Sequence, residues 1–181
     1  MSAPRPPLYL VGLRGAGKST AGARLATRRG VPWVDTDAEI VRRAGATVAQ
    51  IFAARGEAEF RRRERALMLE LLDGGAEQVV ATGGGCVLDP EVHGRLCAAP
   101  AVVWLDAELS LLGKRVRGAP GVRPSLTGGD PVLELGELRA AREALYRRCA
   151  RRRIDTSGLN PDEVADVLEQ LWADLPPHDL R

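Results

Sequence analysis

Short apolar runs alternate along the chain with longer segments in which apolar residues recur every three or four positions. The short runs are too brief for helices and lack the alternating polar residues of a strand with one wet face. They predict strands buried on both faces, at residues 8–11, 31–35, 78–82 and 101–105, with a fifth strand around Ile154. The periodic segments predict amphipathic helices over 18–29, 37–44, 57–72 and 134–152.

Capping residues place two further helices. Thr47 can cap a helix that carries Val48, Ile51 and Phe52 on one face. Asn160 followed by Pro161 is typical of a helix start, and opens a final amphipathic helix. Strands that alternate with helices predict an α/β fold with a parallel sheet covered by helices on both faces.

Three of the predicted strands end in polar or glycine-rich sequence. These ends are residues 12–19, 35–37 and 83–85. Ligands of an open α/β sheet collect beyond the carboxyl ends of its strands. We therefore expect the three segments to meet in one crevice.

The first of these segments has the phosphate-loop pattern G-x-x-x-x-G-K-[ST]. The pattern runs from Gly12 to Ser19, and its Lys18 is one of only two lysines among 26 basic residues. Backbone N–H groups of such a loop wrap a phosphate chain, and the hydroxyl of Ser19 is placed to bind Mg²⁺. A chance glycine-rich turn is the weaker interpretation, because a strand precedes the loop and a helix follows it. Within the loop, Arg14 is expected to face solvent.

The other two strand ends predict acceptor and metal chemistry. Asp35 and Asp37 can both point into the crevice, one toward a Mg²⁺ water shell and the other toward an acceptor hydroxyl. The competing interpretation is that Asp37 only caps the next helix. The triplet Gly83–Gly85 lets the backbone approach a ligand without side-chain obstruction.

Arginine positions add a further prediction. Arg61 and Glu64 share a helix face, so the carboxylate can orient the guanidinium to grip a substrate carboxylate. Arg62, Arg63 and Arg65 are expected on a solvated face. Arg123 lies in a segment rich in Gly and Pro, residues 118–131, from which it could swing over a transferring phosphoryl group. The two histidines, His93 and His178, are expected in surface or packing roles.

Composition excludes several classes of protein. With 181 residues, 45% of them hydrophobic, the chain suits one globular domain. A net charge of +2 gives no nucleic-acid signal, and no apolar stretch has the length of a membrane span. The three cysteines have neither zinc spacing nor a disulfide pattern, and no signal peptide is visible, so a reducing cytoplasm is expected.

Taken together, the motifs resemble those of the shikimate kinase family over residues 8–171. The resemblance rests on the Gly12–Thr20 loop, Asp35-Thr36-Asp37, Phe60-Arg61-Arg62-Arg63-Glu64, Gly83-Gly84-Gly85, Val122-Arg123-Pro124 and Leu145-Tyr146-Arg147-Arg148. It implies a P-loop fold like that of nucleoside monophosphate kinases, three layers around a five-stranded parallel sheet. It also implies phosphorylation of the 3-hydroxyl of shikimate by Mg²⁺–ATP, a step toward chorismate and aromatic amino acids, by a monomer.

The resemblance also assigns roles to residues. Catalysis falls to Lys18, Asp37 and Arg123, and Mg²⁺ to Ser19 and Asp35. The shikimate site comprises Asp37, Arg61, Gly83, Gly84, Gly85 and Arg142. The nucleotide site comprises Gly15, Ala16, Gly17, Lys18, Ser19, Thr20, Arg115, Arg123 and Arg153, with Arg117 as the alternative to Arg115 at the adenine. Residues 1–175 would form one kinase domain, with substrate-binding helices at about 37–65, a lid at about 117–131 and a flexible tail at 176–181.

Two other functions stay open from the sequence. A gluconate or nucleoside monophosphate kinase could use the same scaffold, because gluconate also offers hydroxyls and a carboxylate. A protein that binds nucleotide without transferring phosphate is a second alternative. The retention of Lys18, Asp37 and Arg123 argues against it.

Overall fold

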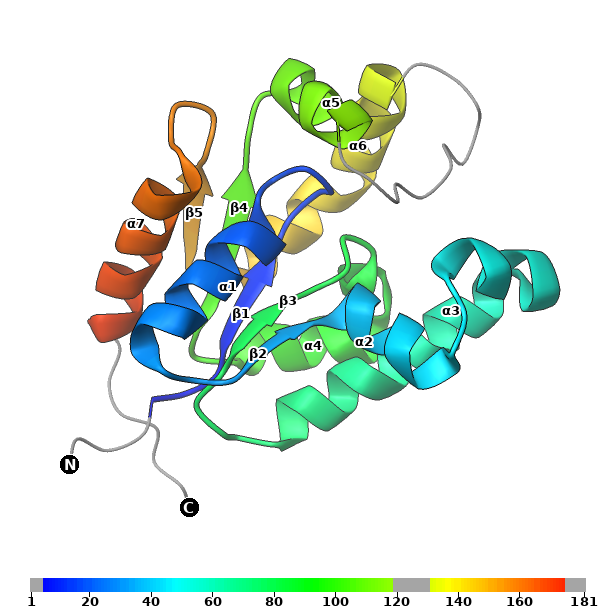
Figure 1. Ribbon diagram of the computed structural model, residues 1–181, viewed down its shortest axis with the longest axis horizontal. Coiled ribbons are helices and arrows are strands. Elements are labelled where there is room, and N and C mark those ends of the chain that lie inside the picture. The colour runs from blue at the N-terminus through cyan, green and yellow to red at the C-terminus, as the bar shows by residue number, and fades with distance from the viewer. Residues whose placement is uncertain (1–4, 119–130, 175–181) are drawn as a thin grey trace.

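Five parallel strands form the centre of the molecule in the computed structural model, which describes residues 5–118 and 131–174. Their order in the sheet is β2-β3-β1-β4-β5 (Figure 1). The strands are β1 (Leu8–Val11), β2 (Trp33–Asp35), β3 (Val79–Ala81), β4 (Val102–Asp106) and β5 (Arg152–Asp155). Every residue of the three inner strands is buried, as expected for strands with both faces covered.

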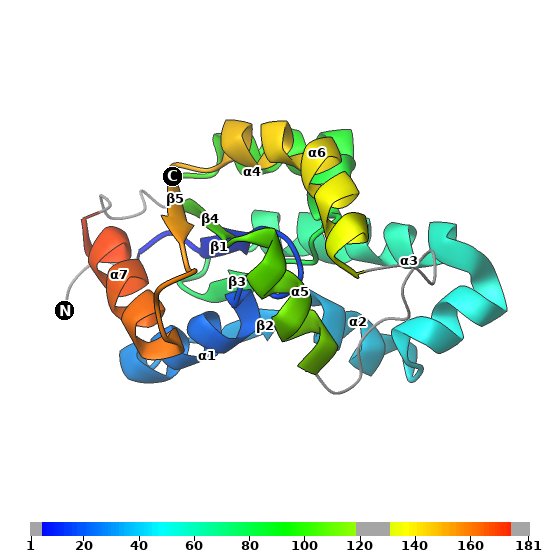
Figure 2. The same cartoon turned by 90° about the horizontal axis from the view of Figure 1, so that it is seen from above.

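Helices form a layer on each side of this sheet (Figure 2). On one side α1 (Lys18–Arg29) packs along α7 (Pro161–Ala173). On the other lie α4 (Pro90–Ala98) and α6 (Pro131–Cys149), with α3 (Val48–Asp73) beside α4. The remaining helices are α2 (Thr36–Ala44), the short 3₁₀ turn η1 (Cys86–Leu88) and α5 (Leu109–Gly118). This is the predicted α/β architecture with a five-stranded parallel sheet.

Local sequence signals explain where several helices begin and bend. Thr47 and Gln50 form a reciprocal capping box at the start of α3, and Asn160 and Glu163 form another at the start of α7. Gly56 interrupts α3 with a φ of 77°, a left-handed backbone that glycine adopts without steric cost. The two helices predicted around this glycine therefore form one kinked element.

Helix α4 was not among the predicted helices, although Asp89 followed by Pro90 is a start signal. The Asp89 carboxylate accepts hydrogen bonds from the N–H groups of Glu91 and Val92. His93, expected in a surface or packing role, lies half-buried on this helix and contacts the carbonyl oxygen of Leu145, whereas His178 lies outside the described residues.

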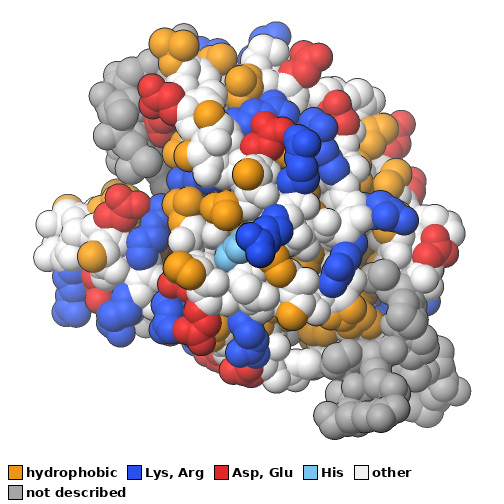
Figure 3. Space-filling view, turned by 180° about the vertical axis from the view of Figure 1, so that it is seen from behind, with side chains coloured by type: hydrophobic (Ala, Val, Ile, Leu, Met, Phe, Trp, Pro, Cys, Tyr) orange, Lys and Arg blue, Asp and Glu red, His pale blue; other side chains and the backbone are white. Residues whose placement is uncertain are grey.

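Arginines on the outer surface are largely paired with carboxylates. Arg28 bridges to Asp162 and Asp166 between α1 and α7, and Arg62 pairs with Glu59 along α3. On the face seen in Figure 3, acidic, basic and apolar side chains are interspersed. Among the described residues, no helix is both long and apolar enough to cross a membrane.

Candidate functional site

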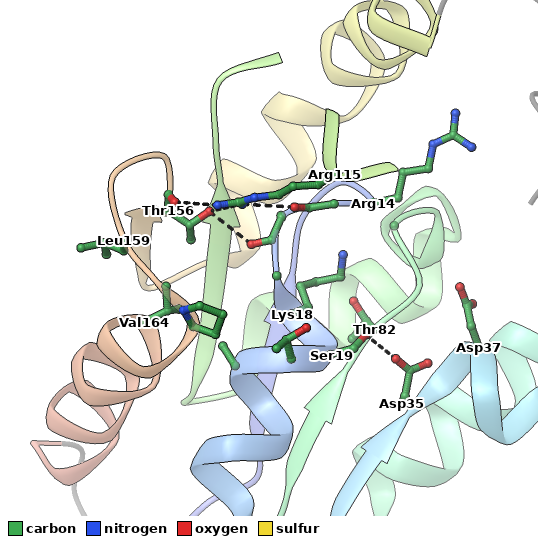
Figure 4. Close-up of a pocket in the computed structure, with 17 residues that line it drawn as sticks. Arg14, Lys18, Ser19, Asp35, Asp37, Thr82, Arg115, Thr156, Leu159 and Val164 are labelled. Carbon is green, nitrogen blue, oxygen red and sulfur yellow. Dashed lines mark hydrogen bonds between the residues drawn. The ribbon is translucent and has the colours of Figure 1, made fainter. Parts of the chain in front are cut away.

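A cavity of 520 Å³ opens at the carboxyl edge of the sheet, where β1, β2 and β3 end. Its floor is the glycine loop and the first turn of α1, including Lys18 and Ser19. Asp35 and Asp37 line the side next to β2 (Figure 4). Arg115, Thr156, Leu159 and Val164 line the opposite side. The predicted convergence of strand ends is therefore confirmed.

The conformation of the glycine loop depends on a close backbone approach at Gly12 and a left-handed residue at Gly17. A Cβ at Gly12 would lie 2.1 Å from the carbonyl oxygen of Leu105, and Gly12 has a φ of 138°. At the other end, Gly17 adopts a left-handed conformation directly before α1 and makes no side-chain cap. The first N–H groups of α1 thus point toward the cavity without a capping side chain, which is the usual anion site of a helix N-terminus.

The Lys18 ammonium lies within this loop. Its Nζ donates to the carbonyl oxygens of Gly12 at 2.8 Å and Leu13 at 2.9 Å. The residue is only 8% exposed. A buried cation held by neutral carbonyls is well placed to exchange them for a charged phosphate oxygen.

Ser19 on the cavity floor and Asp35 on the side next to β2 form a hydroxyl–carboxylate pair. Ser19 Oγ donates to Asp35 Oδ2 at 2.5 Å, and Asp35 Oδ1 accepts from the N–H of Ala38 at 3.0 Å. Asp35 is thus the cap of α2, which begins at Thr36, and the interpretation of Asp37 as a cap is wrong. The Asp37 side chain instead lines the cavity.

The oxygens of Ser19 and Asp35 suit a hard cation that takes only one or two ligands from the protein. In the part of the chain that the structure describes, no three His, Cys, Asp or Glu side chains gather as a metal site. Mg²⁺ usually binds one or two protein oxygens and completes its shell with water and phosphate. Ser19 and Asp35 fit that mode of binding.

Each glycine of the Gly83–Gly85 triplet lies against a different polar side chain. At Gly83 an added Cβ would lie 2.3 Å from Glu64 Oε1 and 2.9 Å from Asp37 Oδ1. It would lie 3.6 Å from Arg142 Nη1 at Gly84 and 2.3 Å from Arg61 Nη1 at Gly85. Side chains at the first and third of these positions would displace their neighbours. The triplet therefore assembles two carboxylates, Asp37 and Glu64, and two guanidinium groups around bare backbone.

Two of these side chains are fixed by ion pairs or hydrogen bonds. Arg61 Nη1 donates to Glu64 Oε2 at 2.7 Å, and Arg61 Nη2 donates to Glu57 Oε1 at 2.9 Å. Burial disfavours its charged form, but the nearby carboxylates outweigh burial and raise the pKa of Arg61 above its ordinary value. Arg142 Nη1 donates to the carbonyl oxygen of Gly84 at 3.0 Å. Arg61 and Gly85 do not line the first cavity but a second one of 330 Å³.

Sequence reasoning missed two residues that hold this arrangement. Thr36 is fully buried, and its Oγ1 accepts from the N–H of Gly83 at 2.8 Å, which joins the end of β2 to the triplet. Tyr146 donates from its hydroxyl to the carbonyl oxygen of Gly84 at 2.5 Å. Thr36 stands between Asp35 and Asp37 in the sequence, and that position could have indicated its role in the site.

The wall opposite Asp37 combines one arginine with apolar side chains. Arg115 donates to the carbonyl oxygens of Gly15 and Thr156 and to the Thr156 hydroxyl. Leu159, Pro161 and Val164 complete this wall, and none of the three was predicted as a site residue, since Pro161 was expected only as a helix start. Arg117 does not line the cavity, so of the two alternatives the structure brings Arg115 to it.

Two arginines are placed differently from expectation, and a third cannot be placed. Arg153 lies over the ring of Trp104 and donates to Asp106 Oδ2 at 2.8 Å, and it does not line the cavity. Asp106 is 2% exposed and also accepts from Arg139 of α6, so this charge holds Arg153 on the α6 side of the sheet. Arg14 does not face solvent freely, because it is three-quarters buried and paired with Glu134. Arg123 lies outside the described residues, as do positions 119–130 of the predicted lid and the predicted tail.

Comparison with protein families gives one match over most of the chain. The family model described as shikimate kinase matches residues 14–172. A shikimate kinase of Symbiobacterium thermophilum is 46% identical over 167 residues, which cover 91% of this chain and 95% of that protein. A shikimate kinase of Gloeobacter violaceus is 44% identical over 168 residues, covering 93% of each.

Solved structures give a similar result. The shikimate kinase of Acinetobacter baumannii in complex with shikimate superposes with a TM-score of 0.81 at 35% identity, covering 92% of this chain and 90% of that one. A gluconokinase of Sinorhizobium meliloti has a TM-score of 0.56 at 20% identity, with 94% of this chain and 93% of that one covered. The second likeness shows the shared fold alone.

Proposed function

This chain belongs to the shikimate kinase family, and we propose that the cavity described above is where Mg²⁺–ATP and shikimate meet. The chain is a shikimate kinase, which uses ATP to phosphorylate shikimate on the route to aromatic amino acids. The observation that carries the placement is the glycine triplet. It holds Asp37, Arg61 and Arg142 together at the same sheet edge as the glycine loop.

The nucleotide would lie with its phosphates on the glycine loop and its base beside Arg115. The uncapped N-terminus of α1 offers N–H groups to the phosphates, and Lys18 follows the transferred phosphoryl group. The planar guanidinium of Arg115 and the apolar side chains of Leu159 and Val164 suit the two faces of an aromatic base. These contacts support the assignment of Gly15–Thr20 and Arg115 to ATP.

Ser19 and Asp35 would hold Mg²⁺ between them, Ser19 directly and Asp35 through the water shell. When bound, the ion neutralises charge on the phosphates and helps to orient them. The 2.5 Å contact between the hydroxyl and the carboxylate supports this proposal, because it places both oxygens at one point of the cavity wall.

Shikimate would bind with its carboxylate on Arg61 and Arg142 and its ring hydroxyls toward Asp37. Arg61 is charged and pre-oriented by Glu64, so little side-chain entropy is lost when it grips a carboxylate. Asp37 lies against Gly83 and lines the same cavity as the glycine loop, whereas Glu64, the other carboxylate beside Gly83, is paired with Arg61. It would orient the 3-hydroxyl toward the phosphoryl group, as a hydrogen-bond acceptor or as a general base.

Phosphoryl transfer itself needs positioning and neutralisation of charge more than covalent help. Lys18 supplies positive charge beside the phosphates. On the acceptor side, Asp37 either takes the proton of the 3-hydroxyl of shikimate or orients this hydroxyl as a hydrogen-bond acceptor. Arg123 and a lid at about 117–131 stay predictions for the closing step. The monomeric state, the cytoplasmic location and the lack of a nucleic-acid partner also stay predictions.

Acceptor specificity is the direct test of this function. ADP release from Mg²⁺–ATP is measured with shikimate, gluconate, each nucleoside monophosphate and no acceptor. We expect release with shikimate alone. The matched variants Arg61→Ala and Arg62→Ala then test the carboxylate site, since Arg62 is exposed and paired with Glu59. We expect a raised shikimate KM only in Arg61→Ala, and equal KM values in both variants would refute the assignment.

A further inference from the structure

The phosphate-binding loop and α6 are joined by an ion pair. Arg14 Nη2 lies 2.6 Å from Glu134 Oε1, across 120 positions of sequence. Arg14 is the third residue of the glycine loop, and Glu134 lies in the first turn of α6. The Glu134 side chain is 5% exposed, so the ion pair is largely shielded from water on the Glu134 side.

The same helix reaches the acceptor side of the cavity. Arg142 lies eight residues after Glu134, a rise of roughly 12 Å along the helix, and both residues are buried. Arg142 and Tyr146 both donate to the carbonyl oxygen of Gly84. Thus α6 contacts the nucleotide loop at one end and the glycine triplet two turns later.

We propose that the Arg14–Glu134 ion pair is a positioning device, which sets α6 against the phosphate loop and thereby sets Arg142 in the acceptor site. This inference rests on the proposed function, because it takes Arg142 as a shikimate contact. Without the guanidinium, the buried Glu134 carboxylate loses a compensating charge, and the start of α6 shifts toward water. A helix moves as one body, so the shift extends to Arg142.

A second anchor limits the size of that shift. Arg139 Nη2 donates to the buried Asp106 at 2.5 Å, and this bond holds the middle of α6 to the end of β4. We therefore expect a change in shikimate affinity of about 3- to 10-fold, in the range of coupling through packed elements, and no loss of turnover. Arg14 also lines the nucleotide cavity, so direct contact with phosphate is the competing explanation.

The experiment compares Arg14→Met, Glu134→Gln and the charge exchange Arg14→Glu with Glu134→Arg. The KM for shikimate, the KM for ATP and kcat are measured for each, with Arg28→Met as the control. Arg28 pairs with Asp162 and Asp166 on the opposite side of the sheet. We expect both single variants to raise the shikimate KM about 3- to 10-fold, with the ATP KM and kcat changed less than about 3-fold. The charge exchange should recover most of this loss, and Arg28→Met should have no effect.

Two outcomes would overturn the proposal. A raised ATP KM with an unchanged shikimate KM in Arg14→Met would make Arg14 a nucleotide contact. A charge exchange no better than the sum of the single changes would show that the pair does not act as a unit. If Arg14→Met does not fold, Arg14→Gln and Arg14→Lys replace it. Arg14→Lys keeps the positive charge and Arg14→Gln removes it, so the pair of variants tests the same ion pair.

Failure of the proposed function would look different. It would appear in the unmodified protein as ADP release that does not depend on shikimate, or as Arg142→Ala with an unchanged shikimate KM. Failure of the positioning role leaves both of those results intact and alters only the response to Arg14 and Glu134.

Discussion

Gly85 and Arg61 are in such close contact that a methyl group on the glycine would lie 2.3 Å from Nη1 of the guanidinium. The φ of Gly85 is −98°, a conformation open to any residue, so the proximity and not the backbone requires glycine. Arg61 is also held by Glu57 and by the buried Glu64. It can move aside only if at least one of these ion pairs changes.

The substitution Gly85→Ala should therefore weaken the acceptor site while leaving the fold intact. We expect the shikimate KM to rise on the order of 10-fold, equivalent to about 1.4 kcal/mol of binding. Gly94→Ala is the matched control, because a Cβ at Gly94 meets nothing within 4 Å and alanine favours the helix. Steady-state kinetics and thermal unfolding of both variants test this. A Gly85→Ala enzyme with an unchanged shikimate KM would contradict the placement of Arg61.

The two lysines of the chain offer an internal comparison. Lys18 is buried in the phosphate loop, whereas Lys114 is exposed on α5. We expect Lys18→Met to lower kcat by roughly 10³-fold, because a phosphate clamp is lost, and Lys114→Met to leave it unchanged. Turnover is measured at saturating ATP and shikimate. Near-normal turnover in Lys18→Met would refute its catalytic role.

Replacement of the carboxylate near the proposed metal site should alter the magnesium requirement. Asn caps a helix about as well as Asp, so Asp35→Asn keeps the start of α2 while it removes the charge. We expect the Mg²⁺ concentration for half-maximal activity to rise about 10- to 100-fold, as found for partners that orient metal ligands. Asp73→Asn, which changes an exposed carboxylate paired with Arg95, is the control. Identical Mg²⁺ titrations for both variants would exclude Asp35 from the ion's shell.

The nucleotide side of the cavity distinguishes two nearby arginines. Arg115 contacts Gly15 and Thr156, but Arg117 does not line the cavity. We expect Arg115→Ala to raise the ATP KM about 10-fold or more, through lost stacking and loop contacts, and Arg117→Ala to leave it within about 2-fold. The reverse pattern would assign the adenine contact to Arg117.

Burial makes two of the three cysteines unreactive near neutral pH. Burial first, and the charge of Glu64 second, raise the pKa of Cys86 from 9.0 to about 12. Burial likewise raises the pKa of Cys149 to about 12, whereas Cys97 is partly exposed. At pH 8 the thiolate fraction of Cys86 is on the order of 10⁻⁴, so iodoacetamide should label Cys97 first and the other two only after unfolding. Mass spectrometry of labelled peptides checks this, and rapid labelling of Cys86 in the folded protein would contradict it.

The raised pKa values of the buried cysteines also make the free energy of unfolding depend on pH. A thiol whose pKa is higher in the folded state favours folding below its unfolded pKa. That stabilisation is lost as the pH rises from about 9 toward 12. The midpoint of denaturant unfolding should accordingly fall over this range, and Cys86→Ala should reduce the fall.

Local chemistry made much of this fold predictable from sequence. The boundaries of α1 follow from the glycine loop before it and Gly30 after it, and α7 follows from the Asn160 cap. The convergence of three strand ends also follows, because parallel strands place their carboxyl ends at one edge. The predicted helix boundaries were least accurate at α6. This helix was predicted over 134–152, but it begins at Pro131 and ends at Cys149.

What the sequence determined by itself was the chemistry of the site: a phosphate loop with Lys18, an acidic strand end, a glycine triplet and Arg61 on a helix face. Each of these depends on spacing within a few residues, where backbone geometry is nearly fixed. Only the tertiary structure decided which charges meet. Arg153 is held by Asp106, and Arg14 is held by Glu134. Long charged side chains have many rotamers, and the choice among them depends on carboxylates that the fold brings from distant parts of the chain.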